Sequence, residues 1–124
     1  IYLVGPEVFL PDPHDIDGQK KLICERYGFC GRFTLDSDLE LDGVSPRAAG
    51  LRISEANEQL MRVCDLVIAN ITPFRGLSAD VGTAYEMGFM RALGKPVLAY
   101  TNKTGLSVER VLSRRQSGPK WVDD

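Results

Sequence analysis

The segment DLVIANI, Asp65 to Ile71, constrains the fold of this chain more than any other stretch. Its centre, Leu66 to Ala69, is apolar at four consecutive positions. A half-exposed strand would alternate apolar and polar residues, whereas a strand that is apolar on both sides is typical of a parallel sheet covered by helices on both faces. The segment therefore predicts an α/β fold with this strand in the centre of the sheet.

The rest of the chain alternates between strand-like and helix-like segments. Buried strands are expected at residues 1–4 and 96–101 and a further strand at 31–36, and helices at about 15–27, 46–63, 78–94 and 107–115. Ser45 and Pro46 are typical of an N-cap and a first helical residue, and Ser78 is expected to cap the helix that follows it. This alternation predicts right-handed crossovers and a ligand at the carboxyl ends of the strands.

The composition is that of one globular domain spanning residues 1–124. The chain is 44% hydrophobic and 26% charged, with a formal net charge of −2, so no nucleic-acid or membrane partner is indicated. The apolar runs are far shorter than the roughly 20 residues of a membrane-spanning helix, and IYLVGPEVF lacks the basic leader of a secretory signal. Three cysteines without CxxC spacing indicate neither a zinc site nor a disulfide framework, and a cytoplasmic protein is expected.

Carboxylates are the residues most able to carry chemistry in this chain. There is neither a GxGxxG nor a P-loop motif, and the single histidine, His14, excludes a recognisable Ser-His-Asp set. The stretch SADVGTAYEMGFM places Asp80 and Glu86 on one helix, six residues and about 240° of rotation apart. On spacing alone, Asp80 is a partner of the helix dipole and Glu86 a solvated side chain.

The apolar stripe of that helix is expected to face the sheet. It consists of Val81, Tyr85, Gly88, Phe89 and Ala92. Glu86 would then lie beside the stripe, and the small residues Gly82 and Ala84 would leave room above the first turns.

Three blocks of the sequence, taken together, resemble the nucleoside 2-deoxyribosyltransferase family. They are IYLVGPEVF, CDLVIANITPFRG and SADVGTAYEMGFMRALGKPVLAYTN, and they cover most of residues 1–102. The resemblance implies a flavodoxin-like three-layer sandwich with a parallel central sheet. It also implies an enzyme of nucleotide salvage that exchanges the base of 2′-deoxyribonucleosides without a metal or organic cofactor. The reaction would pass through a covalent deoxyribosyl-enzyme with net retention, as in retaining glycosidases.

The resemblance also implies roles for particular residues. Glu86 matches the family's nucleophile, and Tyr2 matches a tyrosine that aims it. Asp65 matches an aspartate expected to be partly buried near Glu86 and to act as general acid, and Asp80 matches one that holds sugar hydroxyls. The remaining substrate-binding positions are Gly5, Asn70, Phe74 and Gly76.

Several alternatives stay open at this point. Family members complete the site with an asparagine from a neighbouring subunit, which implies a homo-oligomer with shared active sites. This sequence ends in GPKWVDD without a matching stretch, so either the chain is incomplete there or its site is built differently. A hydrolase of deoxynucleosides or their 5′-monophosphates would use the same Glu86, although VGPEVFLP supplies no evident phosphate donors. A non-catalytic nucleoside-binding module is the third possibility.

Overall fold

Four short strands form one parallel sheet in a computed structural model that describes residues 1–37 and 39–116. The strands are β1 (Tyr2–Val4), β2 (Arg32–Phe33), β3 (Val67–Asn70) and β4 (Val97–Tyr100). Their order in the sheet is β2-β1-β3-β4, so β3 lies inside the sheet as predicted. This is the order of the first four strands of flavodoxin-like folds, in which the switch point lies between β1 and β3.

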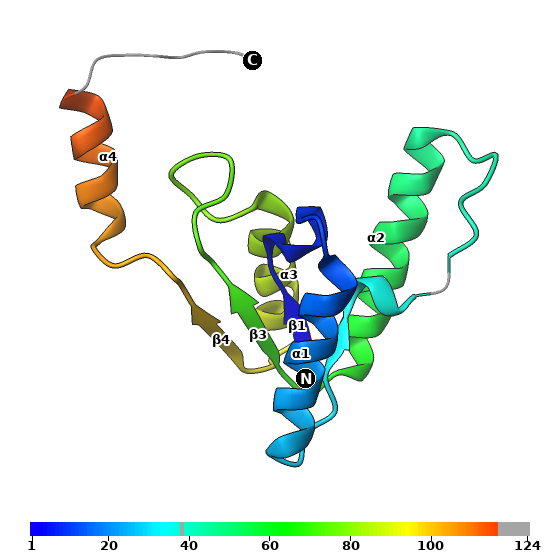
Figure 1. Ribbon diagram of the computed structural model, residues 1–124. Helices are drawn as coiled ribbons and strands as arrows, with labels where there is room; N and C mark the ends of the chain where they lie inside the picture. The colour runs from blue at the N-terminus through cyan, green and yellow to red at the C-terminus, as the bar shows by residue number, and fades with distance from the viewer. Residues whose placement is uncertain (38, 117–124) are drawn as a thin grey trace.

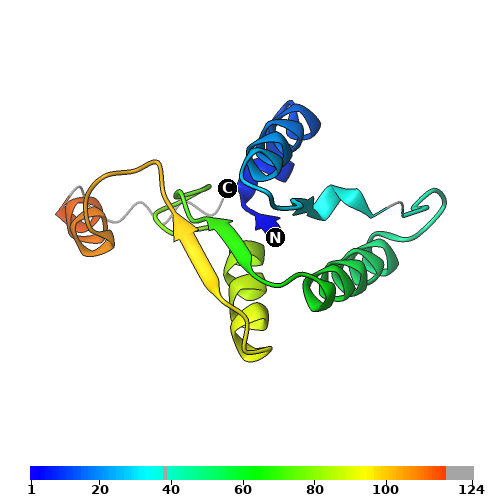
Figure 2. The same cartoon turned by 90° about the horizontal axis from the view of Figure 1, so that it is seen from below.

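The helices are α1 (Pro13–Arg26), α2 (Pro46–Val63), α3 (Val81–Ala92) and α4 (Ser107–Gln116), with short 3₁₀ helices at Pro6–Phe9 and Thr34–Asp36 (Figure 1). α1, α2 and α3 cover the two faces of the sheet, whereas α4 stands away from it beyond β4 (Figure 1). When the molecule is viewed from below, α1 lies on one side of the sheet and α3 on the opposite side (Figure 2). The predicted three-layer α/β sandwich is confirmed.

Two groups of buried side chains hold the layers together. On one face, Tyr2, Val67 and Ala69 of the sheet pack with Met61 of α2 and Met90 of α3. On the other face, Leu3 and Phe33 pack with Cys24 of α1. Successive strand residues alternate between these groups, because side chains along a strand point to opposite faces.

Local signals explain where the helices begin and end. Ser45 Oγ accepts a hydrogen bond from the Ala48 amide, and Pro46 is the first residue of α2, as predicted. Gly28 and Gly94 follow α1 and α3 with φ values of 79° and 73°, a left-handed conformation that glycine adopts without strain.

Three predictions about elements were wrong. β2 covers only Arg32–Phe33, because the Asp36 carboxylate accepts a hydrogen bond from the Phe33 amide and the chain turns into a 3₁₀ helix. Asp80, not Ser78, caps α3, since its carboxylate reaches the Thr83 amide at 3.0 Å. β4 was expected to be buried, yet it is the edge strand of the described sheet, and its Leu98 side chain is largely exposed.

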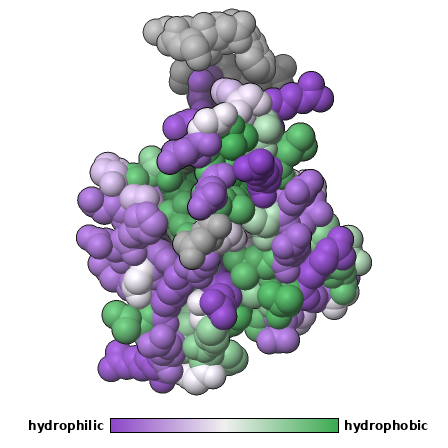
Figure 3. Space-filling model, turned by 90° about the vertical axis from the view of Figure 1, so that its right-hand side faces the viewer, coloured by the Kyte–Doolittle hydropathy of each residue, from purple (hydrophilic) through white to green (hydrophobic). Residues whose placement is uncertain are grey.

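The surface combines polar side chains with exposed apolar ones. On the side where α2 lies, hydrophobic and hydrophilic residues are interleaved (Figure 3), and Leu51 and Ile53 of α2 are among the exposed apolar side chains. Within residues 1–37 and 39–116, no helix is both long enough and apolar enough to cross a bilayer.

Candidate active site

Glu86 lies on the buried face of α3. The buried residues of this helix are Thr83, Glu86 and Met90, which recur at spacings of three and four and so share one face. The predicted stripe was wrong, because Val81 is 84% exposed and Tyr85 is 53% exposed. The carboxylate predicted to lie beside the buried face is therefore in the middle of it.

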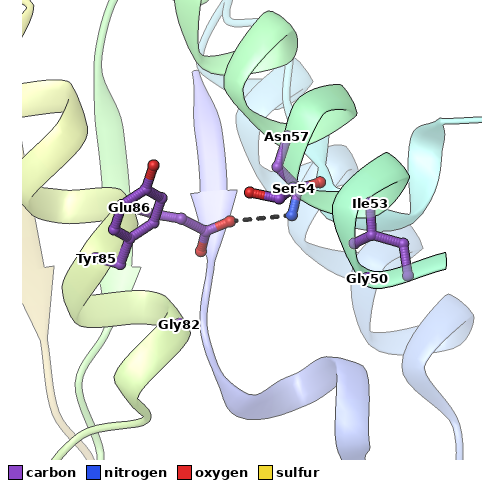
Figure 4. A pocket seen from close by; sticks show the side chains of 7 residues that line it. All are labelled: Gly50, Ile53, Ser54, Asn57, Gly82, Tyr85 and Glu86. Atoms are coloured by element: carbon purple, nitrogen blue, oxygen red, sulfur yellow. Dashed lines mark hydrogen bonds between the residues drawn. The ribbon is translucent and has the colours of Figure 1, made fainter. Parts of the chain in front are cut away.

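Side chains from two other elements hold the Glu86 carboxylate in place. Tyr2 of β1 donates its hydroxyl hydrogen to Glu86 Oε1 at 2.6 Å, and the Asn57 amide of α2 donates to the same oxygen at 3.3 Å. Glu86 and Asn57 point toward each other across the space between α3 and α2 (Figure 4). Both bonds that Glu86 accepts from described residues end on Oε1, so Oε2 is the oxygen that a ligand can approach.

Burial makes Glu86 an unusual acid. Its side chain is only 7% exposed, and loss of hydration raises the pKa of Glu86 from 4.5 to about 7. The negative charge of Asp80 contributes to this rise, whereas the hydrogen bonds from Tyr2 and Asn57 oppose it. Burial and the neighbouring Glu86 carboxylate raise the pKa of Tyr2 far above its ordinary value, so Tyr2 stays a hydrogen-bond donor.

A cleft between α2 and α3 opens beside this carboxylate. It has a volume of about 210 Å³, and its lining residues are Gly50, Ile53, Ser54, Asn57, Gly82, Tyr85 and Glu86 (Figure 4). Ligand pockets commonly measure roughly 300–1,000 Å³. The cleft therefore has room for one small ring, such as a pentose, and a larger ligand would extend over its rim.

Asp80 lies at the start of α3, about one and two-thirds turns before Glu86. Its Oδ2 accepts hydrogen bonds from the Thr83 amide at 3.0 Å and from the Thr83 hydroxyl at 3.4 Å. A Cβ added at Gly82 would lie 3.0 Å from the same oxygen, so glycine at position 82 leaves space for this carboxylate. Asp80 is thus a helix cap whose charge also acts on Glu86.

The model of one family, described as nucleoside 2-deoxyribosyltransferase, matches residues 1–113. This chain belongs to the nucleoside 2-deoxyribosyltransferase family. The resemblance noted in the sequence is thereby confirmed, and the matched residues include β1, α3 and every residue of the cleft.

A solved structure agrees with this assignment, and a curated relative matches nearly the whole chain. The structure of a 2-desoxiribosyltransferase from Leishmania mexicana is 30% identical, with a TM-score of 0.74 over 88% of this chain and 68% of that one. An uncharacterized protein of Schizosaccharomyces pombe is 34% identical over 125 residues, which is 99% of this chain. The chain spans 58% of the length of that relative.

Asp65 is the predicted catalytic residue that the structure does not bring to Glu86. It is exposed, lies in the turn between α2 and β3, and neither lines the cleft nor bonds to Glu86. The prediction of a partly buried carboxylate was therefore wrong. Asp65 precedes a parallel strand, so it lies at the amino edge of the sheet, opposite the edge where ligands of such folds bind.

The other predicted substrate-binding residues of this deoxyribosyltransferase family member lie outside the cleft. Asn70 is buried on the α1 face, and Gly5 packs against Asn70 and Glu7. Phe74 stacks on Phe9 with ring centroids 5.4 Å apart. Gly76 is exposed in the same loop as Phe74. Contacts of these four residues with substrate stay predictions.

Sequence reasoning missed the contribution of α2. Asn57 and Ser54 line the cleft, and Asn57 bonds to the candidate nucleophile. A signal was present, because Asn57 is spaced with Leu60, Met61 and Cys64 on the side of α2 that meets the core. An asparagine at such a position is unfavourable in a helix interior unless its amide has a partner.

No group of three or more His, Cys, Asp or Glu side chains is placed to bind a metal ion in the described part of the chain. The candidate site therefore consists of one buried carboxylate, its two hydrogen-bond donors and a second carboxylate at the helix start. This arrangement suits attack by a carboxylate on an electrophilic carbon.

Proposed function

We propose that this protein transfers the 2-deoxyribosyl group of a 2′-deoxyribonucleoside from one nucleobase to another, with Glu86 as the nucleophile. The observation that carries the proposal is the Glu86 carboxylate, buried and fixed through Oε1 at the wall of an open cleft. A carboxylate fixed in this way is prepared for attack, whereas a helix carboxylate in a mere binding site needs no such fixation.

The first half of the reaction forms a covalent intermediate. Glu86 Oε2 attacks the anomeric carbon, the N-glycosidic bond breaks, and its electron pair leaves with the base. The absence of a 2′-hydroxyl makes the oxocarbenium-like transition state easier to reach, and the nearby carboxylate stabilises its positive charge. The departing base takes up a proton from solvent on a ring nitrogen, because the exposed Asp65 is poorly placed to donate it.

The second half restores the enzyme. A ring nitrogen of the incoming base attacks the same carbon from the face that the first base left, and the bond to Glu86 breaks with its electron pair returning to the carboxylate. The incoming base releases its proton to solvent. Two inversions give net retention. Tyr2 hydrogen-bonds to Glu86 Oε1 through both halves, and Asp80 binds sugar hydroxyls at the start of α3.

Base exchange with and without an acceptor tests this proposal. Deoxyinosine and adenine incubated with the protein should give deoxyadenosine and hypoxanthine, separated by liquid chromatography. Glu86→Ala should abolish the exchange with an unchanged far-ultraviolet circular dichroism spectrum, whereas the control Glu55→Ala, on the exposed side of α2, should keep it. Exchange at the wild-type rate in Glu86→Ala would remove Glu86 from the mechanism.

One observation favours a second candidate, hydrolysis of deoxynucleoside 5′-monophosphates. The first loop supplies no phosphate donors of its own, but the Arg75 guanidinium lies over the Phe9 ring of that loop at 5.1 Å and over Phe74 at 4.8 Å. A cation therefore stands beside the first loop. Free deoxyribose, or its 5-phosphate, released at equal rate with and without adenine would favour the hydrolase over the transferase.

The homo-oligomer with shared sites stays part of the proposal, and its support is membership of the family. The substrates would be a 2′-deoxynucleoside and a free nucleobase. Light scattering of the purified protein measures the mass directly, and a monomer with full exchange activity would contradict a shared site.

A further inference from the structure

We propose that Glu7 is a positioning residue for this site, tying the loop after β1 to the loop between β3 and α3 that leads to Asp80. The inference rests on the proposed function, because it assigns that loop to substrate binding. Glu7 does not contact Glu86, and its effect is expected on substrate affinity, not on the attacking carboxylate.

Glu7 is a buried acid at the carboxyl edge of the sheet. It is 5% exposed, and its Oε1 accepts hydrogen bonds from the Asn70 amide at 2.7 Å and from the Tyr100 hydroxyl at 3.4 Å. The Lys20 ammonium of α1 forms an ion pair with the same oxygen. One carboxylate oxygen therefore joins α1, the end of β3 and the end of β4.

The hydrogen bonds continue from Asn70 into two further loops. Because the Asn70 amide nitrogen donates to Glu7, its Oδ1 is the atom that accepts from the Thr72 amide at 3.0 Å and from the Thr72 hydroxyl at 2.6 Å. The Thr72 hydroxyl oxygen in turn accepts a hydrogen bond from the backbone amide of Asn102 at 2.9 Å. The Glu7 carboxylate thus fixes the start of the β3–α3 loop and the first residues after β4.

The loop after β1 and the β3–α3 loop also meet in an aromatic contact. Phe9, two residues after Glu7, stacks on Phe74 with ring centroids 5.4 Å apart and planes 15° apart. The loop is therefore held at its start through Asn70 and in its middle through Phe74, both times by the loop after β1. Asp80, which caps α3, lies six positions after Phe74, and the Phe74 backbone amide donates to the Ser78 carbonyl at 3.0 Å near the end of the loop.

Glu86 is held independently of this loop. Its hydrogen bonds come from Tyr2 of β1 and Asn57 of α2, on the face of the sheet opposite Asn70 and Glu7. Loss of the Glu7 contacts should therefore weaken substrate binding, raising KM, while the attacking carboxylate and kcat are little affected.

Glycine at position 5 makes room for the Glu7 carboxylate. A Cβ added at Gly5 would lie 2.1 Å from Glu7 Oε2 and 2.8 Å from Asn70 Cβ. Its φ of 167° is extended backbone that any residue adopts, so the requirement for glycine is steric. Gly5→Ala therefore offers a second way to displace Glu7 without removing it.

The charge state of Glu7 suits this role. Burial pushes its pKa upward, but the hydrogen bonds from Lys20 and Asn70 outweigh burial and hold the pKa of Glu7 below its ordinary value. Glu7 is thus ionised, and an ionised carboxylate is a stronger acceptor than a neutral one.

Steady-state base exchange in matched variants tests the proposal. Glu7→Ala and Gly5→Ala should raise KM for the deoxynucleoside about tenfold and change kcat by less than about threefold. Glu7→Gln keeps an acceptor oxygen for Asn70 and should recover most of the wild-type KM. The control is Asp17→Ala, since Asp17 is also buried and pairs with a lysine of α1, Lys21, but has no bond to either loop.

Each outcome supports or overturns the proposal. An equal rise of KM in Asp17→Ala, or an unchanged KM in Glu7→Ala, would show that Glu7 serves stability alone. If the wild-type protein exchanges no base, the proposed function fails, and amide hydrogen exchange then tests the positioning. Faster hydrogen exchange of the Thr72 and Asn102 backbone amides in Glu7→Ala, but not in Asp17→Ala, supports the positioning role. Unchanged hydrogen exchange at these two amides overturns it.

Discussion

At the scale of single residues, burial of Glu86 has two opposite consequences. It removes water from the carboxylate, which leaves a less solvated and more reactive nucleophile once the proton is lost. It also costs folding free energy, because the unfolded chain ionises this group near its ordinary pKa of 4.5 while the folded chain keeps the proton up to about pH 7. Active sites commonly retain such a cost.

Glu86→Gln should stabilise the protein in a pH-dependent way. The pKa of Glu86 is higher in the folded than in the unfolded chain, so the wild-type protein loses stability as pH rises from about 4.5 to 7. The variant has no ionisable group at position 86 and therefore does not lose this stability. The gain should reach about 2–4 kcal/mol at pH 8 and nearly vanish at pH 4.5. Urea denaturation at the two pH values measures it, and an equal gain at both would contradict the raised pKa.

Tyr2→Phe should change the pH dependence of the reaction. The wild-type kcat/KM should fall as pH drops below about 7, because protonated Glu86 cannot attack. The Tyr2 hydrogen bond lowers the pKa of Glu86, so its removal should move this acidic limb to higher pH and reduce kcat by about tenfold or more.

The control for this change is Tyr27→Phe, because Tyr27 is 73% exposed at the end of α1. Its pH profile should match that of the wild-type protein. If the acidic limb of the kcat/KM profile lies at the same pH in Tyr2→Phe as in the wild-type protein, a group other than Glu86 determines that limb.

At the scale of secondary-structure elements, the sequence predicted where helices begin better than which side of a helix is buried. Ser45 and Pro46 start α2 where predicted, because capping is a local interaction between neighbours in the chain. The buried face of α3 was predicted wrongly, because its centre is Glu86, whose partners Tyr2 and Asn57 are distant in sequence. A pattern based on hydrophobicity places such a residue outside.

The position of Asp65 shows a different limit. Its neighbours in DLVIANI predicted the strand correctly, and an aspartate that precedes a parallel strand lies at the amino edge of the sheet, so the strand pattern itself argued against the role that the resemblance implied. The helical spacing of Asn57 with Leu60 and Met61 indicates a position facing the core, but its partner Glu86 is 29 positions away and no local pattern identifies it.

Asp80 combines a helix-capping role with the proposed substrate role, and two substitutions separate them. Asp80→Ala removes the cap and should cost about 0.5–2 kcal/mol of stability, whereas Asp80→Asn keeps an equivalent cap. Both should raise KM for the deoxynucleoside, because neither retains the carboxylate. Thermal denaturation and exchange kinetics measure the two effects. A wild-type KM in Asp80→Asn would leave Asp80 as a cap alone.

At the scale of the whole molecule, the two faces of the sheet hold different parts of the proposed site. The face under α2 and α3 holds Glu86 and the cleft, and the face under α1 holds the Glu7 contacts. The loops at the carboxyl edge join them. The order β2-β1-β3-β4 brings β1 and β3 together at that edge, so residues about 60 positions apart, such as Glu7 and Asn70, become neighbours.

The central claim is a covalent bond between Glu86 and the sugar, and trapping it is the most direct test. The protein is exposed to a 2-fluoro-2-deoxy nucleoside, whose fluorine slows breakdown of the intermediate, and is then digested and analysed by mass spectrometry. We expect the mass of the fluorinated sugar on the peptide containing Glu86, and none in Glu86→Ala. An adduct on another residue, or none while base exchange proceeds, would contradict the account.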